Sequence, residues 1–283
     1  MLLSQLADMT AYTHSNAMFM VHVGDLQRPN LTLCVETAYL MASQYLRNAP
    51  LPTFVLAGDN DWADCPDPNQ ALGYYHKYFD YFERQWTNAT TTVPRMPVEY
   101  NETYPEMWRF TYNKVLFISI QLIDSKAILG TDEWNKRMAA NIQWVFTALG
   151  TDMFSAVVIF GQASVGYETR EFFEGILPAF LGERYWTPVL YLHGDGHKWD
   201  LATKIQTQLG WTSFIDVQVD QGAFADPIIV EFSVDPANPL LQEHDLQYVF
   251  ADGLIRIDRQ RGRYPKGSDG RATTADLQPF PLN

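Results

Sequence analysis

Three short apolar runs in this sequence each lead into a Gly-Asp pair. They lie within residues 21–25, 55–61 and 190–197. An apolar run of this length that stops at a glycine predicts a buried strand, because glycine lets the chain turn sharply at the strand end. Ligand sites of a parallel sheet lie beyond the carboxyl ends of its strands. We therefore expect Asp25, Asp59 and Asp195 to gather at one edge of a sheet.

Carboxylates that gather so closely repel one another, so a positive group is expected between them. A divalent metal ion is the usual partner of such a cluster. Oxygen ligands favour Mn²⁺, Mg²⁺ or Ca²⁺ over Zn²⁺. The alternative is that each Asp simply forms the turn at its strand end. The pattern of three such turns favours the metal site.

Apolar periodicity along the chain predicts alternating strands and helices, which indicates an α/β fold. Strands are expected at residues 16–23, 53–57, 115–122, 156–160 and 189–192, and helices at 31–46, 69–86, 131–150 and 167–180. Thr131 can cap the third helix and Gly150 can end it. We expect residues 87–112 to form a long polar loop, and 213–219 and 228–234 to be strands of a second sheet.

Composition excludes several classes of protein. Of the 283 residues, 47% are hydrophobic and 14% aromatic, which is too much for a disordered chain. No apolar run reaches the roughly 18 residues that a membrane span needs. The net charge of −13 argues against binding a nucleic-acid backbone. We expect one domain over residues 1–255 and a polar, flexible tail over residues 256–283.

The two cysteines each follow one of the Gly-Asp pairs. Cys34 and Cys65 are therefore expected to lie close together if the two strands are neighbours. Three N-glycosylation sequons begin at Asn30, Asn88 and Asn101. Together with a disulfide they favour a secreted or extracytoplasmic protein, if an N-terminal segment is missing from the chain.

Four motifs in order resemble those of the calcineurin-like metallophosphoesterases. Residues 19–25 resemble the second motif of that family, 58–65 a variant of its Gly-Asn-His-Asp/Glu motif, 159–164 the strand that ends in a metal-binding His, and 193–197 a variant of Gly-His-x-His. The resemblance covers about residues 16–235. It implies a two-sheet β-sandwich flanked by helices, in αββα layers.

The resemblance also implies two-metal hydrolysis of a phosphoester, such as a phosphorylated small molecule. Two divalent ions (Mn, Mg, Ca or Fe) would share Asp25 and activate a water for attack on phosphorus. The metal ligands implied by the matching positions are Asp25, Asp59, Gln162, Asp195 and His197. Asn60 takes the place of a His that assists the leaving group, so it can hydrogen-bond a phosphate oxygen but cannot protonate that group.

Three further residues are candidates for binding phosphate or supporting the ligands. Arg109 could hold a phosphate with its guanidinium fork, or form an ordinary ion pair. Asp61 could orient a ligand or be an acid at a helix start. His193 could support the site or be a buried core histidine, since it faces the sheet interior by alternation.

One departure from the family bears on activity. Members open with an Asp-x-His motif after a first strand, and this sequence has no counterpart to it. We expect the chain to bind one ion better than two and to hydrolyse phosphoesters poorly. The alternative is a catalytically silent relative that serves as a binding or structural module.

Overall fold

The computed structural model describes residues 17–27, 34–86, 97–202, 204–220, 225 and 227–259. The chain divides into two compact units. One unit is Tyr12–Val219, and the other combines Met1–Ala11 with Asp220–Asn283. All of the candidate site residues lie in the first unit.

A seven-stranded mixed sheet forms the centre of the first unit. Its strand order is β3 (Glu99–Tyr100), β4 (Trp108–Tyr112), β5 (Val115–Ser119), β6 (Ala156–Phe160), β7 (Val189–His193), β9 (Phe214–Gln218) and β8 (Asp200–Ala202). The four strands β5, β6, β7 and β9 are parallel, and the edge strands pair antiparallel. The strands β5, β6 and β7 are buried along their whole length, as apolar strands covered on both faces are.

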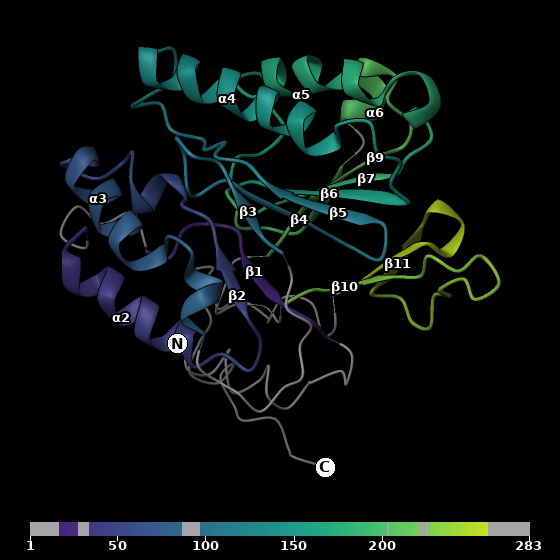
Figure 1. Ribbon diagram of the computed structural model, residues 1–283, viewed down its shortest axis with the longest axis horizontal. Coiled ribbons are helices and arrows are strands. Elements are labelled where there is room, and N and C mark those ends of the chain that lie inside the picture. The colour runs from purple at the N-terminus through teal and green to yellow at the C-terminus, as the bar shows by residue number, and fades with distance from the viewer. Residues whose placement is uncertain are drawn as a thin grey trace, which may run out of the picture. The chain divides into compact units, whose positions relative to one another are not determined.

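Three helices cover one face of this sheet (Figure 1): α4 (Asp132–Leu149), α5 (Arg170–Ile176) and α6 (Lys204–Leu209). The predicted ends of α4 are confirmed. The Thr131 side chain accepts a hydrogen bond from the Trp134 N–H, and Gly150 ends the helix at φ +46°. The apolar stripe of α4 packs into the main core with β6 and β7; it consists of Trp134, Met138, Val145 and Leu149.

A two-stranded parallel sheet lies against the other face. It pairs β1 (Met20–His22) with β2 (Thr53–Val55). Phe54 of β2 packs its ring on Trp108 and Phe110 of β4, with ring centroids 4.3 and 5.5 Å apart. Beyond this pair lie α2 (Glu36–Arg47) and α3 (Pro68–Phe79) (Figure 1). Layers of helix, sheet, sheet and helix therefore build the first unit, and the predicted α/β class is confirmed.

Short 3₁₀ turns connect the helices and strands. The second unit contains a separate sheet. The turns are Asp59–Asp61, Phe82–Gln85, Leu177–Phe180, Gly182–Arg184 and Ala251–Gly253. The second unit has an antiparallel sheet in the order β10 (Ile229–Phe232), β12 (Ile255–Asp258) and β11 (Gln247–Phe250). The first three residues of the predicted tail, 256–258, therefore belong to strand β12. Residues 260–283 of that tail lie outside the described residues.

Two predictions about strands are wrong. Residues 99–100 and 108–112 of the expected loop form the strands β3 and β4. Strand β4 forms a hairpin with β5, because Asn113 and Lys114 take positive φ angles of 46° and 64° and make a tight turn between the two strands. Residues 213–219 do not belong to a second sheet. Their strand β9 pairs parallel with β7, and four of its five residues are buried.

The helix boundaries are shorter than the apolar pattern indicated. Helix α3 ends at Phe79, where Asp80 turns to an extended backbone and a 3₁₀ turn follows. The helix expected over 167–180 begins at Arg170. It becomes a 3₁₀ turn from Leu177, where Pro178 lacks the N–H that an α-helix needs.

Candidate metal centre

Strands β1 and β2 bring their Gly-Asp turns together because they are parallel neighbours. The two turns pack backbone against backbone. A Cβ atom on Gly58 would lie 2.1 Å from Asp25 Oδ1, and one on Gly24 would lie 3.0 Å from the Gly58 Cα. Only glycine fits at either position, and Gly24 also has a φ of +95°. Gly58 therefore allows Asp25 to approach, and Gly24 allows the close approach of the Gly58 backbone and of the Gln162 side chain.

Three carboxylates converge at this edge. Asp25, Asp59 and Asp195 each present an oxygen, and these oxygens all lie within 4.8 Å of one another. Asp25 follows β1, Asp59 follows β2 and Asp195 follows β7. The predicted convergence of these three side chains is confirmed, but they do not share the edge of one sheet: β1 and β2 form the two-stranded sheet, whereas β7 belongs to the seven-stranded sheet.

The side chain of Gln162 lies among the three carboxylates. Its Nε2 atom is 3.0 Å from Asp59 Oδ1, 3.0 Å from Asp195 Oδ1 and 3.5 Å from Asp25 Oδ1. Its Oε1 atom accepts the N–H of Asp124 at 3.0 Å. That backbone donor fixes which end of the amide faces the cluster. Gln162 therefore presents a donor to the carboxylates, whereas the resemblance implies a metal ligand at this position.

His197 contacts one edge of the cluster. Its Nε2 atom is 2.9 Å from Asp25 Oδ2. His197 has a left-handed backbone, with φ +53°, in the turn that also carries Asp195. The same turn is bonded to the end of β6, because the Asp195 N–H donates to the Gln162 carbonyl at 3.1 Å. The histidine is thus placed beside Asp25, and its charge acts on Asp195 as well by lowering the pKa of that carboxyl against the effect of burial.

Burial and mutual repulsion disfavour the charged forms of the carboxylates in this cluster. Burial, reinforced by the Asp25 charge, raises the pKa of Asp59 above its ordinary range. Burial, together with Asp124 and Asp25, raises the pKa of Asp195 to about 6. Within the described ranges, no Lys or Arg forms an ion pair with any of the three carboxylates. Hard oxygen donors at this spacing fit a divalent ion such as Mn²⁺, Mg²⁺ or Ca²⁺.

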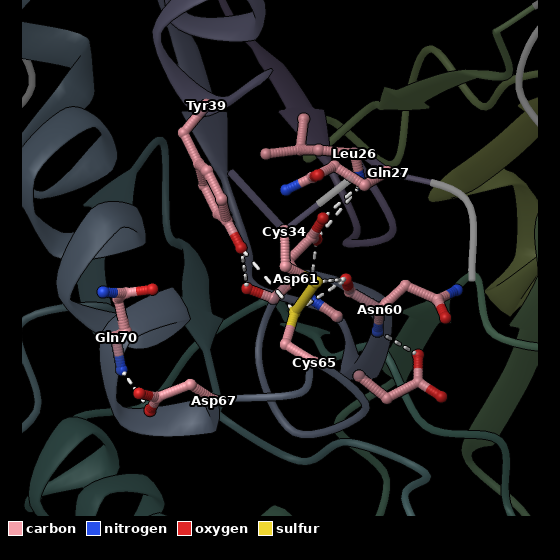
Figure 2. Close-up of a disulfide and its surroundings, with 11 residues drawn as sticks. Leu26, Gln27, Cys34, Tyr39, Asn60, Asp61, Cys65, Asp67 and Gln70 are labelled. Carbon is pink, nitrogen blue, oxygen red and sulfur yellow. Dashed lines mark hydrogen bonds between the residues drawn. A yellow bond between two sulfur atoms is a disulfide. The ribbon is translucent and has the colours of Figure 1, made fainter. Parts of the chain in front are cut away.

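Asp61 connects the two Gly-Asp turns that carry Asp25 and Asp59. Its carboxylate accepts three backbone N–H groups, from Leu26, Gln27 and Gly58, each at 3.0 Å (Figure 2). Asp61 is fully buried, and burial raises its pKa to about 7 against the effect of these donors. Asp61 therefore orients the turns that carry Asp25 and Asp59.

A disulfide supports the same turn from the other side. Cys34 and Cys65 are bonded, with Cα atoms 5.9 Å apart, so their predicted proximity is confirmed. Both sulfur atoms lie close to the Asn60 carbonyl oxygen, at 3.9 and 3.6 Å (Figure 2). The Tyr39 hydroxyl donates to the Asp61 carbonyl at 2.9 Å. The 3₁₀ turn of Asp59–Asp61 is thus fixed to the start of α2.

The remaining candidates fall into two groups. Asn60 directly follows Asp59, and its backbone N–H donates to Asp59 Oδ1 at 2.8 Å. His193 is a buried core residue, with Nε2 at 2.9 Å from Asp216 Oδ1.

Arg109 is engaged elsewhere in the sheet. Its guanidinium pairs with Glu99 at 2.7 Å and stacks 5.0 Å above the Trp144 ring. His193 and Arg109 have no described contact with the three carboxylates. Arg109 therefore forms an ordinary ion pair, and His193 is a buried core histidine. These are the alternatives to a site role that the sequence left open for the two residues.

Asp124 is a residue beside the cluster that the Gly-Asp pattern of the sequence does not indicate. It orients Gln162 through its N–H, and its charge helps to raise the pKa of Asp195. It follows the apolar run 115–123, so a strand that ends in Asp was visible in the sequence. Asp124 follows Ile123 and not a glycine, so it does not match the Gly-Asp pattern.

In the part of the chain that the structure describes, no helix is long and apolar enough to cross a membrane. Comparison with known proteins adds no assignment: no family model matches the sequence, and no curated protein matches it.

Proposed function

We propose that this protein is a metal-dependent phosphoester hydrolase with a metallophosphatase-like fold. The observation that carries the proposal is the convergence of Asp25, Asp59 and Asp195 at strand ends, with oxygens within 4.8 Å and no Lys or Arg paired to them in the described ranges. A cluster of one buried and two half-buried carboxylates whose only paired basic side chain in those ranges is His197 is costly to a fold while it is charged, so its presence supports a bound cation.

The layered arrangement of the first unit supports the fold part of the proposal. The β1–β2 pair packs face to face on the seven-stranded sheet through Phe54 and Trp108, with helices outside both sheets. Motifs resembling those of calcineurin-like enzymes fall at the ends of β1, β2, β6 and β7. These are the positions from which that family presents its ligands.

The residues of the cluster have distinct roles in this proposal. Asp25, Asp59 and Asp195 would hold the ion, with Asp25 placed between the other two and His197. The bound ion would lower the pKa of a water and neutralise charge on phosphate. His197 holds Asp25 in place through its Nε2 contact. Asn60 can donate an amide hydrogen bond to a phosphate oxygen, but the leaving oxygen must take its proton from water.

One observation favours the second candidate, a metal-binding module without catalysis. The Gln162 amide group donates toward all three carboxylates and is held in that orientation by Asp124. A donor in this place partly satisfies the cluster without a second ion. Slow or absent turnover with intact metal binding is the expected behaviour of such a module.

A hydrolysis assay tests the proposal. The wild type and Asp25→Asn are incubated with p-nitrophenyl phosphate and bis(p-nitrophenyl) phosphate, with Mn²⁺ and with EDTA. We expect Mn²⁺-dependent release of nitrophenol that Asp25→Asn lowers at least about 100-fold. Arg109→Gln is the matched control and should retain the wild-type rate. Hydrolysis that persists in EDTA or in Asp25→Asn would contradict the proposal.

An added proton donor sharpens the test. Asn60→His places an imidazole where the leaving group is expected, and general acid catalysis contributes roughly 10²–10⁴-fold. We expect a rate gain with phenyl phosphate, whose leaving group needs a proton, and little gain with the p-nitrophenyl ester. Equal changes on both esters would argue against Asn60 facing the leaving group.

A further inference from the structure

A surface pocket opens on the loop that follows β6. It has a volume of about 290 Å³ and is lined by Val165, Gly166, Tyr167, Arg170, Lys204 and Gln208. This volume is close to the lower end of small-ligand sites, roughly 300–1,000 Å³. None of its lining residues belongs to the carboxylate cluster, yet its loop begins immediately after Gln162.

The loop is held rigidly between the cluster and the pocket. The Thr169 hydroxyl donates to the Ser164 carbonyl at 2.8 Å and accepts the Gly166 N–H at 2.9 Å. Ser164 in turn donates to Gln218 Oε1 at 3.0 Å. A Cβ atom on Gly196 would lie 2.2 Å from that same oxygen, so the turn carrying Asp195 and His197 touches Gln218. The pocket is therefore connected to the candidate metal centre by short, ordered contacts.

Tyr167 is the most exposed large hydrophobic side chain of the described residues. It is 89% exposed, whereas Val165 beside it is only 4% exposed and forms an apolar floor. No ring contact with another described aromatic side chain involves Tyr167. An aromatic ring exposed at the edge of a pocket offers a face on which a flat ring of a ligand can stack.

Two cationic side chains line the same pocket. The Lys204 Nζ atom donates to the Val165 carbonyl at 3.4 Å, which holds the ammonium group at the rim. Arg170 bonds Glu174 through Nε at 2.6 Å, and its terminal nitrogens have no partner among the described residues. The Glu168 carboxylate lies beside Gly166, where a Cβ atom would be 3.7 Å from its Oε2 atom. In a chain of net charge −13, a pair of cations in one pocket marks a place for an anion.

We infer that this pocket binds the non-reacting part of the substrate, and that the substrate is a phosphate ester with a flat aromatic or nucleoside group. The ring stacks on Tyr167, the Gln208 amide can hydrogen-bond its edge, and a second phosphate of the substrate, distinct from the one that is hydrolysed, faces Lys204 and Arg170. The inference rests on the proposed function for its meaning as a substrate site. The pocket itself is defined by its own residues and can be tested without a metal ion.

Binding without metal tests the pocket. Isothermal titration in EDTA uses three probes: adenosine 5′-monophosphate, adenosine, and glycerol 3-phosphate. We expect the nucleotide to bind more tightly than either partial probe, because only it offers both ring and phosphate. Equal affinity for glycerol 3-phosphate and the nucleotide would overturn the ring contact, and no binding of the nucleotide at millimolar concentration would overturn the inference as a whole.

Variants assign the two contacts. Tyr167→Ala should weaken nucleotide and adenosine binding at least about 5-fold, since stacking of a base on an aromatic side chain contributes roughly 1–3 kcal/mol. Lys204→Gln should weaken binding of the nucleotide and of glycerol 3-phosphate, and leave adenosine unchanged.

Matched controls use exposed side chains outside the pocket. Trp186→Ala removes an aromatic ring that is 74% exposed, and Lys136→Gln removes an exposed lysine on α4. Both should bind like the wild type, and effects as large as those of the pocket variants would overturn the inference. Because all titrations are made in EDTA, intact binding with no hydrolysis would reject the proposed function alone. Hydrolysis without nucleotide binding would reject the pocket alone.

Discussion

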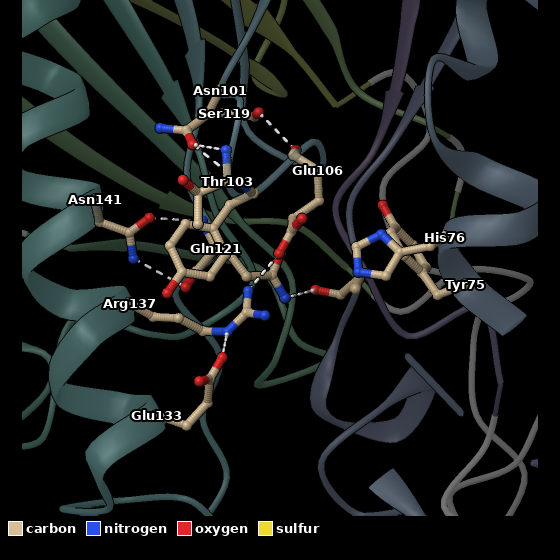
Figure 3. Close-up of polar contacts among 12 residues, drawn as sticks. Tyr75, His76, Asn101, Thr103, Glu106, Ser119, Gln121, Glu133, Arg137 and Asn141 are labelled. Carbon is tan, nitrogen blue, oxygen red and sulfur yellow. Dashed lines mark hydrogen bonds and ion pairs between the residues drawn. The ribbon is translucent and has the colours of Figure 1, made fainter. Parts of the chain in front are cut away.

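Two groups of buried charges in the first unit are balanced in opposite ways. Between α4 and the turn before β4, Arg137 contacts the carboxylates of Glu106 and Glu133 (Figure 3). Its guanidinium also stacks over the rings of Trp62 and Tyr104. At the carboxyl ends of β1, β2 and β7, three aspartates face each other with an amide and an imidazole, but no Lys or Arg of the described residues pairs with them. The first group carries its own cation, and the second does not.

The difference teaches what each group is for. A buried charge with an internal partner is complete and holds two elements together, as Arg137 does for α4 and Glu106. A carboxylate cluster without such a partner is costly in the folded protein while it is charged, and binding of an external cation would offset that cost. The disulfide and Asp61 show that the fold supplies rigidity to the second group by other means.

Removal of the internal cation should have the largest effect on stability. Arg137→Met leaves the buried Glu106 charge without a partner, which costs about 3–5 kcal/mol of the free energy of unfolding. Urea denaturation in EDTA measures it. In Arg170→Met, which breaks a pair that is half exposed on both sides, the loss should be no more than about 1 kcal/mol.

The double variant Arg137→Met/Glu106→Gln checks the cause. It should recover part of the loss, because the unpaired charge is gone. A loss in Arg137→Met as small as that in Arg170→Met would mean that the first group is not a structural ion pair.

The disulfide at the second group should come next. Cys34→Ser/Cys65→Ser opens a loop that spans 31 residues, and its loss should cost about 2–4 kcal/mol of the free energy of unfolding. We expect the cost to be larger in EDTA than in Mn²⁺, since an ion holds the same turns together. Dithiothreitol should lower the stability of the wild type and leave the double variant unchanged. A wild type that is insensitive to the reductant would contradict this account.

The amide donor of Gln162 should have a smaller effect. Gln162→Glu replaces that donor with a fourth carboxylate, which should raise Mn²⁺ affinity about 10-fold, or 1.4 kcal/mol, and lower the thermal midpoint of the metal-free protein. Isothermal titration and thermal unfolding measure the two changes. Gln143→Glu, at an exposed position on α4, should change neither. Weaker Mn²⁺ binding in Gln162→Glu would show that the amide is not the group that competes with the ion.

The smallest expected effect is on pH dependence. The pKa of Asp195 is about 6 in the folded protein, above its ordinary value, so the folded state retains a proton that the unfolded state releases. Stability of the metal-free protein is then greatest below pH 4 for this group and falls as the pH rises through 6. Asp195→Asn should raise the thermal midpoint at pH 7 by about 2–4 °C and have no effect at pH 4. The control is Asp235→Asn, because hydrogen bonds from the Ala237 N–H and the Asn238 side chain lower the pKa of Asp235. This variant should not raise the thermal midpoint at pH 7.

The convergence of the aspartates could be predicted because it depends on local rules. A glycine after an apolar run ends a strand, and parallel strands present their ends at one edge, so Asp25 and Asp59 meet whatever the rest of the chain does. The capping of α4 by Thr131 is local in the same sense.

Other features depend on partners far away in the sequence. The direction of the Gln162 amide is set by the N–H of Asp124, 38 residues earlier. The place of β9 in the main sheet depends on pairing with β7, and its apolar pattern alone fits either sheet. The exclusion of Arg109 and His193 from the site likewise follows from Glu99 and Asp216, which are neighbours only in the fold.

Titration of Mn²⁺ into the metal-free wild type and Asp59→Asn tests the central claim most directly, namely that the second group of charges is completed by an external cation. We expect the wild type to bind Mn²⁺ with a dissociation constant on the order of 10 µM or tighter, and Asp59→Asn to bind at least about 100-fold more weakly while unfolding at a higher temperature without metal. A wild type that takes up no Mn²⁺ at millimolar concentration, or an Asp59→Asn variant that binds it equally well, would contradict the account.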